Sequence, residues 1–239
     1  MDDSDLFAAA HRQPTTRRPL LGLTILVIED SRYACEAMRL LCLRSGARIR
    51  RADCLKSARR HLQVYRPSVL IVDLGLPDGS GVDLIEEAVA ATPRVGVVLG
   101  TSGDDTGHDA ALAAGADGFL AKPVNSLATF QQAILSKLPE DRQPVGATDL
   151  PDEVIHPDLL AFQDDMAHVA DVLNVSQEDK MLNYVAQFLG GVARSVGDNS
   201  LAEAASGLTT ALSTGRPVTA EAARIAGLVQ DRLNQKLAI

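Results

Sequence analysis

Short apolar runs alternate with amphipathic stretches from residue 23 to residue 138, and this alternation limits the possible folds more than any other feature. The runs have the length and β-branched composition of buried strands, whereas the stretches between them carry apolar residues at helical spacing. The predicted strands are Leu23–Ile28, Arg48–Ala52, Ser68–Asp73, Val95–Leu99 and Gly118–Ala121. The predicted helices are Ser31–Ser45, Lys56–Val64, Val82–Ala91, Asp104–Ala114 and Ser126–Leu138. This order predicts an α/β domain in which helices cover both faces of a five-stranded, parallel, doubly wound sheet.

The rest of the chain differs in composition from this α/β segment. Residues 1–20 hold no long apolar stretch and predict a flexible N-terminal arm, so the α/β domain is expected to cover residues 21–138. Residues 139–157 contain four prolines and predict a semi-stiff linker. Residues 158–239 show only helical periodicity, over segments near 158–173, 178–195, 199–213 and 218–237. We therefore expect a small all-α domain there, serving protein–protein contact.

Charged and polar side chains stand where the predicted strands end. Glu29 and Asp30 follow the first strand, Asp73 ends the third, Thr101 comes just after the fourth, and Lys122 follows the fifth. In a parallel sheet these ends meet at one edge, where such sheets place their functional sites. Three carboxylates so close together require a lysine or a divalent cation to offset their charge. Oxygen ligands suit Mg²⁺ better than zinc.

Four segments carry a resemblance to a known family: VIEDS at 27–31, VDLGLPDGSG at 72–81, TS at 101–102 and GADGFLAKP at 115–123. They resemble the receiver domains of two-component response regulators, over about residues 22–138. The resemblance implies a chemotaxis-type, flavodoxin-like fold. It also implies that Asp73 accepts a phosphoryl group from a sensor histidine kinase or a histidine phosphotransfer protein.

The resemblance implies a role for each of the other edge residues. Glu29, Asp30, Asp73 and the backbone carbonyl of Gly75 would bind Mg²⁺. Thr101 and Lys122 would contact the phosphoryl oxygens, Phe119 would be the aromatic switch, and the Lys122–Pro123 peptide would be cis. Phosphoryl transfer depends on positioning and charge neutralisation, which such a set of groups provides.

Each of these residues also has a simpler possible role. Asp30 and Thr101 could cap helices, Asp73 could begin a turn, Phe119 could be ordinary core and Lys122 could be solvated.

Two glycines depart from what the family usually carries. Gly75 lies two residues after Asp73 and Gly103 two residues after Thr101, at positions whose side chains in the family tune the access of water to the acyl phosphate. A glycine neither positions nor blocks water. We hypothesise that partners, more than these two positions, set the lifetime of the phosphorylated state.

The acidic C-terminal part argues against nucleic acid as a partner. Residues 140–239 hold 7 Lys and Arg against 15 Asp and Glu, which accounts for the whole net charge of −8. DNA-binding domains normally present a basic surface. Val218–Ala238 is similar to the first part of a helix-turn-helix, and a DNA-binding transcription regulator therefore stays open as an alternative.

A second alternative is a phosphorelay or phosphate-sink protein. Gly197–Leu212 is similar to the central helix of histidine phosphotransfer domains, with Ser206 where the histidine is expected. A four-helix bundle with an exposed Ser206 would favour such a degenerate domain, whereas a long apolar seam would favour a homodimer. His168 lacks the run that usually follows a phosphotransfer histidine.

Sequence motifs and cysteines indicate the chemistry and the location of the protein. No catalytic motif is present, so we expect no enzyme activity beyond transfer onto Asp73 and hydrolysis. Three cysteines (Cys35, Cys42 and Cys54) without a CxxC pair fit a reducing cytoplasm. No apolar run is long enough for a membrane span.

Overall fold

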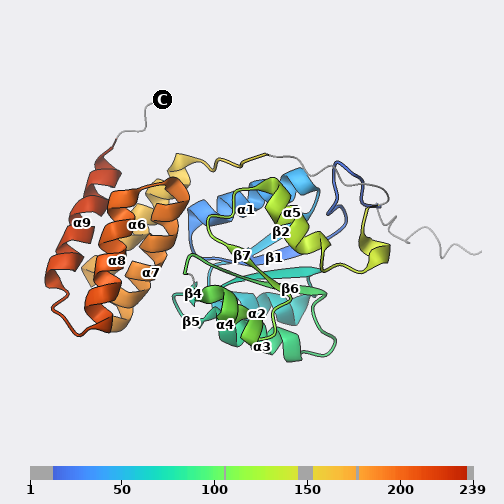
Figure 1. The fold of residues 1–239 in the computed structure, drawn as a ribbon, viewed down its shortest axis with the longest axis horizontal. Coiled ribbons are helices and arrows are strands. Elements are labelled where there is room, and N and C mark those ends of the chain that lie inside the picture. Colours follow the sequence, from blue (N-terminus) through green and yellow to red (C-terminus); the bar gives the residue numbers. More distant parts are fainter. Residues whose placement is uncertain (1–12, 105, 145–152, 176–177, 236–239) are drawn as a thin grey trace, which may run out of the picture.

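A computed structural model describes residues 13–104, 106–144, 153–175 and 178–235 of the chain. Its first part is a five-stranded parallel sheet with strand order β2-β1-β3-β6-β7 (Figure 1). The strands are β1 (Thr24–Ile28), β2 (Arg48–Ala52), β3 (Val69–Asp73), β6 (Val97–Ser102) and β7 (Gly118–Ala121). The helices of this part are α1 (Arg32–Ser45), α2 (Leu55–Val64), α3 (Gly81–Ala90), α4 (Gly107–Ala113) and α5 (Leu127–Leu135). The predicted doubly wound α/β fold is therefore confirmed.

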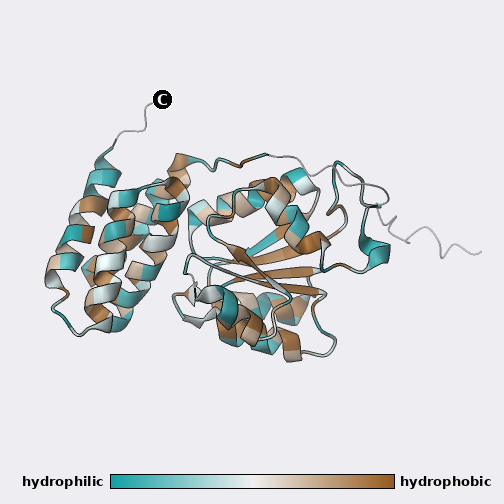
Figure 2. Cartoon of the chain, viewed as in Figure 1, coloured by the Kyte–Doolittle hydropathy of each residue, from teal (hydrophilic) through white to brown (hydrophobic). Residues whose placement is uncertain are grey.

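The helices form two layers that bury the two faces of the sheet. Helices α1 and α5 cover one face, and α2, α3 and α4 cover the other (Figure 1). The central strands are the most hydrophobic part of the domain (Figure 2), because their side chains are buried on both faces. Strand β3 is buried along its whole length, so its last residue, Asp73, is held by a rigid element.

The observed boundaries differ from the predicted ones at a few positions. A short antiparallel hairpin, β4 (Gly75–Leu76) and β5 (Gly79–Ser80), occupies the predicted turn cluster. Helix α4 begins at Gly107 instead of Asp104, because the Ser102 hydroxyl and the Asp104 carboxylate accept local backbone hydrogen bonds that form a turn first.

The described ends of the arm and of the linker contact the sheet domain. Leu20, which the sequence places in the arm, is completely buried in the core of the sheet domain. At the end of the linker, Ile155 is buried in the same core. Most of the arm (residues 1–12) and the middle of the linker (residues 145–152) lie outside the described residues.

The second part of the chain is all-helical, as the sequence predicts. It comprises α6 (Leu159–Val175), α7 (Asp179–Val196), α8 (Asn199–Ser213) and α9 (Thr219–Asn234), which pack around a common apolar core. Asp198 caps α8 by accepting from the Leu201 amide and pairs with Arg232 of α9 at 2.7 Å, which joins the last two helices. Across the described residues, no helix combines the length and the apolar composition needed to cross a membrane.

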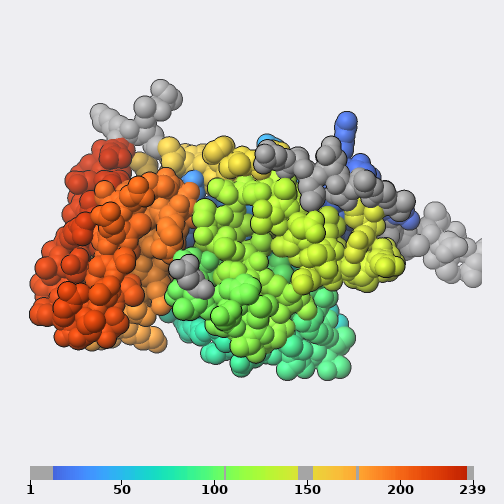
Figure 3. All heavy atoms as spheres, viewed as in Figure 1, coloured from blue at the N-terminus to red at the C-terminus, as the bar shows by residue number. Residues whose placement is uncertain are grey.

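The helical domain packs directly against the carboxyl-end edge of the sheet (Figures 1 and 3). Helix α6 contacts the start of α1, and α7 contacts β4. Residues far apart in the sequence therefore meet over the edge to which the sequence assigns the functional site.

Candidate functional site

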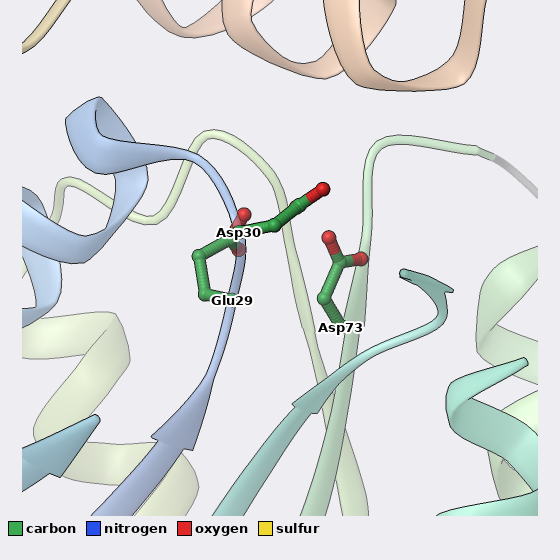
Figure 4. Close-up of side chains that lie close together, drawn as sticks. All are labelled: Glu29, Asp30 and Asp73. Atoms are coloured by element: carbon green, nitrogen blue, oxygen red, sulfur yellow. The ribbon is translucent and has the colours of Figure 1, made fainter. Parts of the chain in front are cut away.

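The three predicted metal-binding carboxylates meet at the carboxyl edge of the sheet. Glu29 and Asp30 follow β1, and Asp73 ends the neighbouring strand β3 (Figure 4). One carboxylate oxygen of each lies within 4.8 Å of the others. Glu29 is 2% exposed and Asp73 is 6% exposed, so this charge is concentrated where water screens it poorly.

Lys122 provides the positive charge that the sequence assigns to this cluster. Its ammonium lies 2.8 Å from Asp73 Oδ2 and 2.7 Å from Glu29 Oε2. Burial lowers the pKa of Lys122, but the carboxylates of Asp73 and Glu29 outweigh burial and raise that pKa overall, so the ammonium stays charged. The peptide between Lys122 and Pro123 is cis, as the resemblance implies.

One lysine does not offset three carboxylates. Burial, together with the neighbouring carboxylates of Asp73 and Asp30, raises the pKa of Glu29 to about 8 although Lys122 opposes this. Burial and Asp73 raise the pKa of Asp30 to about 7. A divalent cation would relieve this repulsion, and the three carboxylates offer the hard oxygen ligands that such a cation prefers. The residues present therefore fit a hard divalent cation.

Thr101 and Phe119 lie on the two strands that follow Asp73 across the sheet. Thr101 pairs with Asp73 across β3 and β6, and its buried hydroxyl donates to the backbone carbonyl of Leu120 at 2.7 Å. Phe119 is partly buried, with its ring edge-to-face against His108 at 5.6 Å between ring centroids. This arrangement places the predicted hydroxyl and the predicted aromatic switch on adjacent strands.

Helix α7 brings a tyrosine to the acidic cluster that the sequence did not reveal. The Tyr184 hydroxyl donates to Asp30 Oδ2 at 2.7 Å and lies 3.0 Å from His168 Nε2. Burial and the adjacent Asp30 carboxylate raise the pKa of Tyr184, which keeps the hydroxyl protonated as a donor. His168 is exposed and contacts this tyrosine from the solvent side of α6.

Helix α6 adds a second contact to the same edge. The Asp165 carboxylate, 1% exposed, accepts from the Ser31 hydroxyl at 2.7 Å, from the Arg32 amide at 2.7 Å and from the Tyr33 amide at 3.1 Å. These groups form the N-terminus of α1, whose first amides have no partner within the helix. A carboxylate is also stabilised by the helix dipole at this end. Asp165 therefore attaches the helical domain to the sheet domain one residue after Asp30.

A cavity of about 540 Å³ lies between the acidic cluster and the helical domain. Its walls include Asp73 and Lys122 from the sheet domain and Gln187, Arg194 and Ser206 from the helical domain. In Figure 4, a helix of the C-terminal domain passes over the three carboxylates. Ser206 is exposed on α8 of a four-helix arrangement, which is the arrangement expected of a degenerate phosphotransfer-like domain.

The comparisons with known proteins identify the sheet domain. The family model for the response regulator receiver domain matches residues 25–134. The KDP operon transcriptional regulatory protein KdpE of Escherichia coli is 31% identical over 41% of this chain and 44% of its own length. The transcriptional regulatory protein KdpE of Mycobacterium tuberculosis is 32% identical over 52% of this chain and 58% of its own length. The chain thus spans about half the length of these relatives.

Solved structures were also compared with the chain. The CheY-like response regulator receiver domain protein from Methanospirillum hungatei is 24% identical, with a TM-score of 0.44, over 50% of this chain and 95% of its own. The helical domain is assigned to no family by these comparisons. Residues 25–134, with the acidic cluster and its lysine at the sheet edge, are a response regulator receiver domain of the two-component type.

Proposed function

We propose that Asp73 accepts a phosphoryl group from a sensor histidine kinase or a histidine phosphotransfer protein in a Mg²⁺-dependent reaction. The observation that supports this most directly is the position of Lys122, which contacts Asp73 on one side and Glu29 on the other. A lysine in that position neutralises charge that develops on a phosphoryl group bonded to Asp73. The free cysteines fit the reducing cytoplasm in which we place this exchange.

The transfer needs little from the protein beyond positioning and charge. One oxygen of Asp73 attacks the phosphorus, and the bond between phosphorus and the donor imidazole breaks. Lys122 would pair with a phosphoryl oxygen, while Glu29, Asp30 and the Gly75 carbonyl would complete the ligand set for Mg²⁺. The bound ion would supply charge neutralisation on the phosphoryl oxygens.

Thr101 and Phe119 would couple this chemistry to a change of surface. The Thr101 hydroxyl bonds to the Leu120 carbonyl, and it must leave that acceptor in order to donate to a phosphoryl oxygen. Phe119 lies on the adjacent strand β7, and its ring could then move toward the core. The changed surface would alter the protein–protein contacts of the receiver and of the helical domain.

Phosphorylation from acetyl phosphate tests this proposal. We expect the wild-type chain to form a hydroxylamine-labile phosphoprotein only when Mg²⁺ is present, and Asp73→Asn to form none. Asp83→Asn is the matched control, because Asp83 is exposed on α3 and belongs neither to the acidic cluster nor to the cavity lining. Equal labelling of wild type and Asp73→Asn would contradict the proposal, as would full labelling in EDTA.

The names of the relatives favour a second candidate, a DNA-binding transcription regulator. The excess of acidic residues in the helical domain argues against it. Selection from a random pool of DNA duplexes at about 150 mM salt separates the two, because weak nonspecific binding fades at that ionic strength. Enrichment of one sequence would establish the second candidate.

A relay or phosphate-sink function is the third candidate, which the exposed Ser206 favours. Under it, the receiver alone would suffice, and deleting residues 140–239 would leave the pathway output intact. Loss of output on this deletion would instead support a function in partner contact.

A further inference from the structure

We propose that the helical domain is a built-in dephosphorylation element whose helix α7 inserts Gln187 and Arg194 into the phosphorylation pocket of its own receiver. Gln187 would orient the water that hydrolyses the acyl phosphate, and Arg194 would bind the phosphoryl oxygens. This inference rests on the proposed function, because it requires Asp73 to be the phosphoacceptor.

The two glycines of the receiver define where these side chains lie. A Cβ added to Gly75 would meet only Gln187 Oε1, at 3.3 Å. A Cβ added to Gly103 would lie 2.5 Å from Arg194 Nη2, closer than real side chains approach. Both side chains of α7 therefore occupy the space that a larger residue would fill at these positions. The helical domain thus fills the space at the two positions where the receiver has a glycine and no side chain.

Gln187 lies close to the reacting carboxylate. The Gly75 amide donates to Asp73 Oδ1 at 3.3 Å. The Gln187 carboxamide is next to Gly75. Gln187 is exposed and lines the cavity that also contains Asp73 and Lys122, so water can reach its amide. A carboxamide can accept from a water molecule and donate to a phosphoryl oxygen at once, as the glutamine of GTPases does when it orients the attacking water.

Arg194 adds a positive charge to the lining of this pocket. Among the residues that the structure describes, its guanidinium has no hydrogen-bond or ion-pair partner, and it lies about two turns of α7 after Gln187. A guanidinium matches the geometry of phosphoryl oxygens, which it can bind through two parallel hydrogen bonds. It would offset the charge that the phosphoryl group adds to an already acidic site.

Hydrolysis of the acyl phosphate consumes one water molecule and no other reactant. The oxygen of a water molecule attacks phosphorus on the side opposite the Asp73 oxygen, and the bond between phosphorus and that oxygen breaks. The Asp73 carboxylate is regenerated, inorganic phosphate leaves, and the proton of the water passes to the phosphate. Gln187 orients the water and does not itself take up the proton.

The decay of the phosphoprotein tests the inference. The full chain is phosphorylated with acetyl phosphate, the donor is removed by rapid desalting, and the phosphorylated fraction is followed on phosphate-affinity gels. We expect the half-life to rise about tenfold or more in Gln187→Ala, by analogy with the loss of one donor from a catalytic site. Arg194→Ala should also lengthen it. Asn183→Ala is the matched control, because Asn183 is exposed on α7 but does not line the cavity.

A rescue experiment tests whether the carboxamide acts through its position beside Gly75. Gly75→Asn places a carboxamide in the space beside Gln187 from the receiver side, so the double variant Gly75→Asn/Gln187→Ala should regain part of the lost rate. A general loss of folding would not be rescued in this way, and thermal unfolding curves of all variants check the fold directly.

The possible results separate this inference from the proposed function. An unchanged half-life in Gln187→Ala would overturn the inference. A shortened half-life would also overturn it and would show that α7 shields the acyl phosphate from water. Failure of the wild-type chain to be labelled at Asp73 would overturn the proposed function instead.

Discussion

Replacing Asp165 with alanine should release the helical domain from the receiver. Asp165 is the buried acceptor of three hydrogen bonds from the start of α1. In the docked state, Asp165→Ala would leave the amides of Arg32 and Tyr33 without an acceptor. Once the domains separate, water satisfies both amides. The substitution therefore acts on the docking equilibrium and leaves each domain folded.

The size of the effect follows from these contacts. A buried amide left without a partner costs about 1–3 kcal/mol, so two such amides weaken docking by roughly 2–6 kcal/mol. At about 1.4 kcal/mol per factor of ten, a central value near 4 kcal/mol lowers the docked-to-undocked ratio about 700-fold. The neighbouring substitution Asp164→Ala is the control. It removes only an ion pair with Arg32 in which the side chains are 55% and 70% exposed, worth at most about 1 kcal/mol.

Amide hydrogen exchange at the start of α1, together with small-angle X-ray scattering, measures this equilibrium. We expect Asp165→Ala to speed exchange of the Arg32 and Tyr33 amides and to increase the radius of gyration, while Asp164→Ala resembles wild type. Equal protection of these amides in wild type and Asp165→Ala would refute the reasoning. So would an effect of Asp164→Ala as large as that of Asp165→Ala.

Two further predictions concern Tyr184 and Asp198. Tyr184→Phe removes the hydroxyl that bonds to Asp30 in competition with a cation, so calorimetry should show Mg²⁺ binding several-fold more tightly; an unchanged affinity would contradict this. Asp198→Ala removes a helix cap and an ion pair and should lower the free energy of unfolding of the helical domain by about 1–2 kcal/mol, whereas Asp198→Asn keeps the cap and should cost less. The hydrogen bond from Arg232 lowers the pKa of Asp198, so this stabilisation is present above the ordinary pKa of an aspartate and is lost as the pH falls through the lowered value. Urea unfolding of wild type and Asp198→Ala across that pH range checks the sign, and a constant difference between them would contradict it.

The sequence alone was sufficient to predict the receiver fold and the edge where Glu29, Asp30, Asp73 and Lys122 meet. The periods of apolar residues are local, and right-handed crossovers between parallel strands leave few topologies. Charged residues directly after strands must then share one edge. Boundaries were less certain where side chains of loops, such as those of Ser102 and Asp104, accept backbone hydrogen bonds and delay a helix.

The contacts between the two domains could not be predicted in this way. Asp165, Tyr184, Gln187 and Arg194 lie on two helices, and none belongs to a motif. Helical periodicity shows which face of α7 is apolar and buried within the helical domain, but it does not show what the polar face meets. The sequence contained one local indication, the glycines at 75 and 103. They show that the receiver has no side chain at these positions, but not which residues fill the space.

The sequence by itself determined the receiver domain, its acidic edge and the helical character of the C-terminal part, because strand order and helix periodicity follow from local patterns and chain connectivity. Only the tertiary structure decided that α7 lies over Asp73 and that Tyr184 bonds to Asp30. Docking of two folded domains depends on the shape and charge of whole surfaces, and these surfaces exist only after each domain has packed its core.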